Sequence, residues 1–153
     1  MKSDVGQLLR ELDEGWLNFD EISTVEVTSE HASFPVESAL RSNAGSGWRA
    51  SQKGEQQIRI IFDQPKSLHC IHLRFDESDS ARTQEFVIRS WCAAGGRPKE
   101  IVRQQWNFSP AGSTIEVEDY TVELNAVTVL ELAIKPDLGR GEAVASLTAC
   151  RLG

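Results

Sequence analysis

The sequence predicts an all-β protein: an antiparallel β-sandwich of the jelly-roll kind with one α-helix at its N-terminus. Three observations predict this fold. From Ser23 to the end of the chain, apolar and polar residues alternate with the two-residue period of strands. Clusters of Gly, Pro, Asn and Asp separate the alternating segments, as is typical of turns. No segment of helical period lies between them, so we expect antiparallel strands joined by turns.

About eight strands are expected. They cover residues 25–28, 57–62, 68–75, 85–91, 100–108, 115–122, 127–135 and 145–152. In the second segment, Ile58, Ile60 and Phe62 share one face of an extended chain. After a turn that Pro65 marks, the third segment repeats this alternation. We therefore predict that these two strands are antiparallel partners or near neighbours.

Residues 4–19 are expected to form the N-terminal helix, because their apolar side chains recur every three or four positions. These side chains are Val5, Leu8, Leu9, Leu12 and Trp16. The stripe fits two roles: packing on the body of the domain, or forming a subunit interface through Leu8, Leu12 and Trp16. We accordingly divide the chain into a helix over residues 1–20 and a β-sandwich domain over residues 23–153.

The charge balance constrains the partners. Sixteen Lys and Arg against 23 Asp and Glu give a net charge of −7 at pH 7, which disfavours nucleic acid and anionic membranes. No apolar run approaches the roughly twenty residues that span a bilayer. The N-terminus lacks the apolar core of a secretory signal, so we expect a cytoplasmic protein. Three widely spaced cysteines, Cys70, Cys92 and Cys150, predict free thiols.

Four short motifs carry a resemblance to a known family. They are SEH at 29–31 followed by Pro35, AL at 39–40, GWRAS at 47–51, and GEQ at 54–56 before a strand. In this order they resemble the opening of a discoidin domain, also called the coagulation-factor C-type domain. The resemblance covers roughly residues 23–152 and implies a galactose-binding-like β-sandwich. Trp48 is expected to plug one end of that sandwich.

The resemblance also implies a function: a non-catalytic carbohydrate-binding module, as many bacterial relatives are. In such relatives a His, an Arg, an Asn and an aromatic residue contact the sugar from loops at one end. The equivalents here are His31, Arg82, Asn107 and either Trp106 or Phe108. An aromatic ring stacks on the C–H face of a pyranose, and planar polar groups bond its hydroxyls. Core packing for Trp106 and backbone bonding for His31 are the alternatives.

The expectation for cofactors is none. Where discoidin relatives carry Asp-Gly after the AL pair, this chain has Arg41-Ser42, which removes a carboxylate from the family's structural calcium site. The acidic stretch of Asp76, Glu77 and Asp79 is expected to be a solvated turn. A bound structural calcium is the alternative in both places.

Catalysis has no recognisable motif in this sequence, which lacks a nucleophile elbow and a glycine-rich phosphate loop. Glu116, Glu118 and Asp119 cluster on one expected strand, and paired carboxylates can perform acid–base chemistry. Charge on an exposed strand face explains them more simply. We therefore expect that the protein is not an enzyme.

The rival hypothesis is an intracellular protein–protein interaction or assembly module with no small-molecule ligand, as a homodimer or with another protein. Arg59, Arg74, Arg89 and Arg103 occupy strand positions that could make an arginine-lined sheet face. A solvated face on which these arginines pair with Glu and Asp is the alternative.

Overall fold

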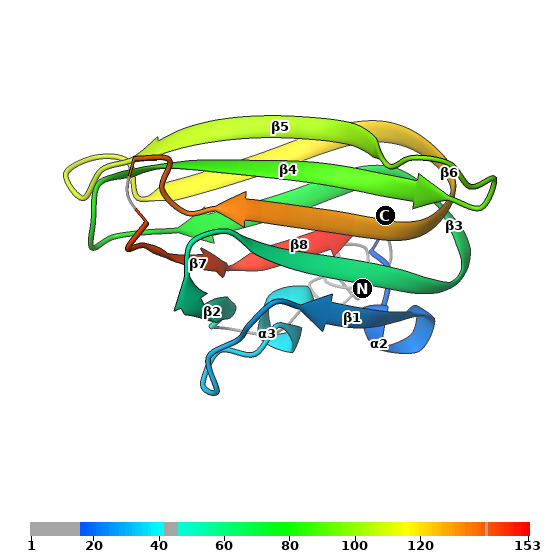
Figure 1. The fold of residues 1–153 in the computed structure, drawn as a ribbon, viewed down its shortest axis with the longest axis horizontal. Coiled ribbons are helices and arrows are strands. Elements are labelled where there is room, and N and C mark those ends of the chain that lie inside the picture. Colours follow the sequence, from blue (N-terminus) through cyan, green and yellow to red (C-terminus); the bar gives the residue numbers. More distant parts are fainter. Residues whose placement is uncertain (1–15, 42–45, 140) are drawn as a thin grey trace, which may run out of the picture.

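The computed structural model describes residues 16–41, 46–139 and 141–153, and these form a β-sandwich (Figure 1). The elements in chain order are α2 Phe19–Ile22, β1 Ser23–Val27, α3 Glu37–Leu40, β2 Trp48–Lys53, β3 Gln56–Asp76, β4 Arg82–Cys92, β5 Lys99–Phe108, β6 Ile115–Lys135, β7 Val144–Leu147 and β8 Ala149–Leu152. Every pairing among these strands is antiparallel. The predicted all-β class is confirmed.

Two long strands, β3 and β6, contribute to both layers of the sandwich. Their ladder runs without a break from Gln56↔Ile134 to Ile61↔Val129, shifts register, and runs unbroken again over residues 70–76 of β3. On one side of the shift the order is β1-β3-β6-β4-β5, and on the other β8 pairs with β3. In Figure 1 the first layer faces the viewer and β8 lies behind it.

The predicted pairing of residues 57–62 with 68–75 is wrong, because both segments belong to β3 and pair with β6. Pro65 lacks a backbone N–H, and it lies within the register shift, where the strand bends without ending. Residues 115–122 and 127–135 are likewise one strand, β6, which has Ala126 at a φ of 53° near the same bend. A break in the ladder therefore marks a change of layer here, whereas the sequence suggested a hairpin.

Two further differences concern short strands. The expected strand 145–152 is split at Thr148 into β7, which pairs with β2, and β8, which pairs with β3. Residues 48–53, which lie outside the expected strands, form β2. Trp48 is 1% exposed, which confirms the expected plug. Gly47 precedes it at a φ of 74°, where a Cβ would lie 2.6 Å from the Leu147 carbonyl oxygen, so only glycine fits.

The predicted N-terminal helix over residues 4–19 lies mostly outside the described residues. At its predicted end, residues 16–18 are not helical, and Phe19 begins the four-residue helix α2. The side chain of Asn18 caps α2 by accepting from the backbone N–H of Asp20. None of the helices in the described part of the chain is long and apolar enough to cross a membrane.

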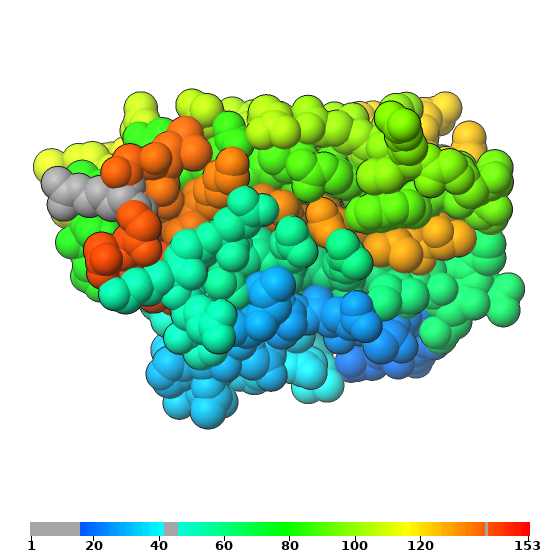
Figure 2. Space-filling model, viewed as in Figure 1, coloured from blue at the N-terminus to red at the C-terminus, as the bar shows by residue number. Residues whose placement is uncertain are grey.

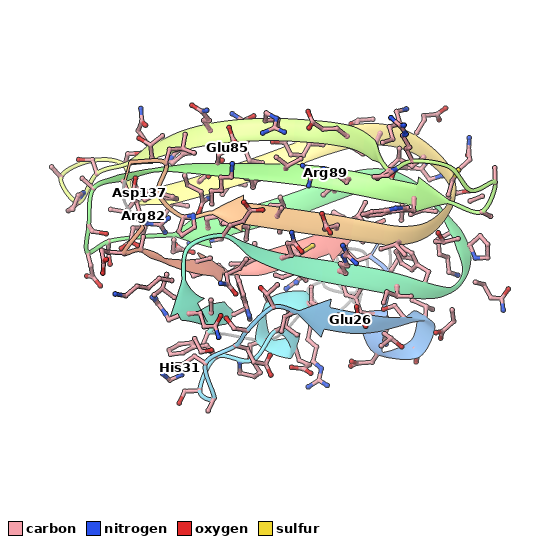
Figure 3. All side chains as sticks on the ribbon, viewed as in Figure 1. Glu26, His31, Arg82, Glu85, Arg89 and Asp137 are labelled. Carbon is pink, nitrogen blue, oxygen red and sulfur yellow. The ribbon has the colours of Figure 1, made fainter. Side chains whose placement is uncertain are left out.

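The outer face of the first layer carries three of the four arginines that were expected to line a sheet face. Arg59 and Arg89 both contact Glu131, at 2.7 and 3.2 Å, and Arg103 contacts Glu85 at 2.9 Å. Arg74 lies in the other layer, so its predicted place on this face is wrong: strand β3 bends between it and Arg59. Arg89 and Glu85 are labelled on the front of Figure 3.

Candidate functional site

Four of the five predicted site residues lie where β4 begins and β5 ends. The ladder places Arg82 opposite Phe108, Thr83 opposite Asn107, and Gln84 opposite Trp106. Side chains alternate across a strand, so those of Arg82, Phe108 and Trp106 share the inner face, whereas Asn107 lies on the outer face. There Asn107 accepts a hydrogen bond of 2.7 Å from the hydroxyl of Thr83.

Arg82 is enclosed by the protein, and its side chain is 2% exposed. Its Nε donates to Glu77 at 3.0 Å, and one terminal nitrogen donates to Gln84 and to the Pro136 carbonyl. Its guanidinium carbon lies 5.0 Å from the centre of the Phe108 ring, which is itself 2% exposed. Burial alone would raise the pKa of Glu77, but the N–H of Asp79 and the Arg82 guanidinium hold it below its ordinary value. This geometry joins β4, β5 and the 136 turn.

A buried carboxyl group lies beside this cluster. Glu116 is 0% exposed and accepts a hydrogen bond of 3.2 Å from Gln84, while its second oxygen, Oε2, has no partner among the described residues. Burial, followed by the negative charge of half-buried Glu118, raises the pKa of Glu116 to about 8. Trp106 contributes an indole Nε1 that is also buried and unpartnered within the described residues.

The expectation of an exposed face for the three acidic residues of this strand is therefore wrong for Glu116. Only Asp119 is fully on the outside, where its carboxylate lies 2.7 Å from Nδ1 of His72. Glu116 points inward, where Gln84 of β4 donates a hydrogen bond to it. The alternation pattern of one strand cannot reveal a partner on another strand. Glu116 is enclosed between the layers, so its carboxyl group is not open to a substrate.

The fifth predicted residue, His31, lies in a different cluster. Its ring centre is 5.4 Å from that of Phe34, and the Arg49 guanidinium carbon is 5.6 Å from the Phe34 ring centre. Nδ1 of His31 accepts from the Ser33 N–H at 3.0 Å, so the neutral ring carries its proton on Nε2. His31 and Arg49 are exposed and Phe34 is half-buried.

Backbone hydrogen bonds hold this loop in one conformation. The His31 N–H donates to the Arg49 carbonyl at 2.7 Å, and the Arg49 N–H donates to the Phe34 carbonyl at 3.1 Å. Beneath them the buried indole of Trp48 donates to the Ser29 carbonyl at 3.1 Å. The loop projects from one corner of the molecule in the space-filling view (Figure 2), at the same end of the sandwich as Arg82 (Figure 3).

The structure thus divides the predicted site into two parts. It groups Arg82, Trp106 and Phe108 inside the sandwich and places His31 in an exposed cluster that the prediction did not assemble. Phe34 follows His31 in the same loop, so sequence proximity could have suggested it. Arg49, in β2, reaches both through backbone hydrogen bonds between β2 and this loop, which no local pattern reveals.

Comparisons with known proteins agree with this fold. The model of the XRCC1 N-terminal domain family matches residues 17–124. The chain belongs to this family. A comparison with curated proteins found no match. The XRCC1 N-terminal domain fold, as it occurs here, is a galactose-binding-like β-sandwich, which confirms the fold that the discoidin resemblance implied.

Several solved structures similar to this XRCC1 N-terminal domain family member are carbohydrate-binding modules. A family 32 module of Clostridium perfringens NanJ in complex with galactose has a TM-score of 0.67 at 16% identity, over 90% of this chain and 97% of that one. A module from a family 31 glycoside hydrolase of the same organism has a TM-score of 0.66 at 16% identity, over 99% and 98%. A third, in complex with GalNAc-β-1,3-galactose, has a TM-score of 0.60 at 13% identity, over 85% and 94%. At these identities the likeness shows the fold.

The acidic turn after β3 uses its carboxylates within the protein. Asp76 pairs with Arg74 at 3.0 Å and accepts from the Thr148 hydroxyl at 2.6 Å, and Glu77 pairs with Arg82. Among the described residues, no group of three His, Cys, Asp or Glu side chains is placed to hold a metal ion.

A pocket of about 470 Å³ lies away from both clusters, between α2, α3, β1 and the C-terminal strand. Its lining includes Trp16, Leu40 and the ion pair of Asp20 with Arg41. None of the predicted site residues contributes to it.

Proposed function

We propose that this chain is a non-catalytic carbohydrate-binding module and that the exposed cluster of His31, Phe34 and Arg49 contacts the sugar. The observation that carries the proposal is the composition of this cluster: an aromatic ring, an imidazole and a guanidinium at one protruding corner. Named ligands of the similar structures, galactose and GalNAc-β-1,3-galactose, support a sugar as the ligand class.

The chemistry of the three side chains suits a pyranose. Phe34 supplies apolar ring surface for the C–H groups of the sugar. Nε2 of His31 is a donor, because its Nδ1 already accepts from the Ser33 N–H. The Arg49 guanidinium has no hydrogen-bond acceptor among the described residues, so its donors are available for hydroxyl pairs.

The predicted residues take different roles in this proposal. His31 contacts the ligand, and Asn107, which is exposed at the same end, is a second contact for a longer sugar. Arg82 and Phe108 support the end of the sandwich from within, because both are enclosed. Half-buried Trp106 joins them, with its indole Nε1 buried.

The test is a titration of the ¹⁵N-labelled protein with galactose, N-acetylgalactosamine and lactose, followed by amide shifts. We expect one of these sugars to shift the amides of residues 31–34 and 49, and Phe34→Ala and Arg49→Ala each to weaken binding at least about tenfold. Arg97→Ala, which removes an exposed arginine from the β4–β5 turn, is the matched control. Unchanged affinity in both cluster variants, or no shifts up to about 50 mM sugar, would overturn the proposal.

A further inference from the structure

The first half of β6, residues 115–124, is an edge of the second layer. It pairs with β3 on one side, whereas β4 pairs only with residues 127–135 of the same strand. No backbone hydrogen bond from another described segment reaches residues 115–124 on the other side. In an antiparallel strand alternate N–H and C=O groups point away from the paired neighbour, so this edge presents a row of unpaired groups. Figure 1 shows this part of β6 in yellow, along the same margin as β5.

Two of the residue types that commonly protect a sheet edge from pairing, proline and lysine, are missing from this edge. Its ladder with β3 is regular from Cys70↔Thr121 to Asp76↔Ile115. No proline, glycine or lysine occurs in residues 115–124, and prolines and lysines are common means of blocking an edge. One register shift with β3 lies between Thr121 and Leu124, at the end of this edge.

In this edge, apolar side chains face the solvent and an acidic side chain faces the interior, which is the opposite of the usual pattern of a solvated strand. Ile115 is 45% exposed and Val117 is 46% exposed, whereas Glu116 between them is fully buried. These are two of the three large apolar side chains that are exposed in the described part of the chain. Alternate exposed apolar residues beside an unpaired backbone fit a strand that receives another strand.

The charge of this edge indicates which side chains the added strand has. Asp119 and Glu123 follow Ile115 and Val117 on the outer face and are exposed, and residues 115–124 contain no basic residue. Asp119 also lies 2.7 Å from Nδ1 of His72 on β3. A second copy of this strand would bring acidic side chains together, which is unfavourable. Lys or Arg on the added strand would pair with both carboxylates.

We propose that residues 115–124 of β6 bind an extended, basic segment of a protein partner by strand addition. In this segment apolar residues lie opposite Ile115 and Val117, and Lys or Arg lie opposite Asp119 and Glu123. Main-chain hydrogen bonds supply affinity, and the alternating side chains supply specificity. This surface is independent of the sugar contact at Phe34.

The test uses the peptide Lys-Thr-Thr-Thr-Lys-Thr-Val-Thr-Val, which is written for antiparallel addition, and its reversed sequence for parallel addition. We expect one of them to shift the amides of residues 115–124 in the ¹⁵N-labelled protein, with weaker binding at higher salt. The double variant Asp119→Lys with Glu123→Lys is expected to lose at least about tenfold in affinity for this peptide, and to bind the peptide with Glu in place of both Lys.

Two outcomes would overturn the proposal. One is the absence of edge shifts with either peptide up to about 1 mM. The other is a concentration-dependent dimer, seen by light scattering, whose perturbed amides map to residues 115–124, because the occupant would then be a second copy. Phe34→Ala is the matched control: it leaves peptide binding unchanged, and the Asp119 and Glu123 double variant leaves sugar binding unchanged, so the two proposals fail separately.

Discussion

The same pair of side chains, an arginine above a phenylalanine ring, occurs twice at one end of this molecule. The guanidinium carbon lies 5.0 Å from the ring centre in the Arg82–Phe108 pair and 5.6 Å in the Arg49–Phe34 pair. The Arg82 side chain is 2% exposed, whereas Arg49 is exposed to solvent. Residue type and ring contact are therefore equal, and burial separates the two.

The difference between the pairs lies in what else the guanidinium contacts. Arg82 donates to a carboxylate, an amide and a backbone carbonyl from three different places in the chain. Arg49 has only the Phe34 ring among the described side chains. A cation with all its bonds inside the protein stabilises the fold, and one with free donors is available to a ligand.

The largest effect is expected for Arg82→Ala. This change removes the ion-pair partner of half-buried Glu77 and the side-chain donor to the Pro136 carbonyl, so the free energy of unfolding falls by about 3–5 kcal/mol. Urea denaturation measures this loss as a shift of the urea concentration at the unfolding midpoint, with the m-value unchanged. A fall below about 1 kcal/mol would show that Arg82 does not hold this end together, and the two arginine pairs would no longer differ in kind.

A second prediction concerns the buried carboxyl beside Arg82. The pKa of Glu116 is raised to about 8 by burial and then by Glu118, above its ordinary value of 4.5. The unfolded chain therefore releases this proton at lower pH than the folded protein does. Stability from neutral Glu116 is complete below about pH 4.5 and is lost as pH rises through about 8.

The measurement is the melting temperature from about pH 5 to about pH 9. We expect it to decline over this window in the natural protein and to change much less in Glu116→Gln, since glutamine is neutral throughout. The lowered pKa values of Asp76 and Glu77 act in the opposite direction and below this window, because their stabilising charge is lost as pH falls below about 4. If the melting temperature of Glu116→Gln falls with pH as steeply as that of the natural protein, another group causes the effect.

Sequence patterns predicted the fold class well, because Ile58, Ile60 and Phe62 alternate as a half-buried strand does and this alternation is local. The continuity of β3 through Pro65 could not be predicted, since the bend depends on how β6 is placed beside it. In β6 the alternation gave the wrong face. Glu116 is buried because Gln84, from another strand, bonds it.

The site was predicted in part, and for a similar reason. His31, Arg82 and Asn107 lie at one end of the sandwich, as loops joining antiparallel strands can be expected to do. Whether an arginine is enclosed or exposed depends on partners that are distant in sequence, such as the Pro136 carbonyl for Arg82. The residue list alone therefore could not separate supporting residues from contact residues.

The smallest effect on stability is expected for Arg49→Ala. Its guanidinium is exposed and contacts only the Phe34 ring, so the free energy of unfolding changes by no more than about 0.5 kcal/mol. Urea denaturation of Arg49→Ala and Arg82→Ala under the same conditions measures the two stability changes together. A loss above about 2 kcal/mol would make Arg49 a structural residue like Arg82. The backbone bonds between the 31–34 loop and β2 would then be insufficient to hold that loop, and loss of sugar binding in Arg49→Ala would report unfolding of the loop instead of a missing contact.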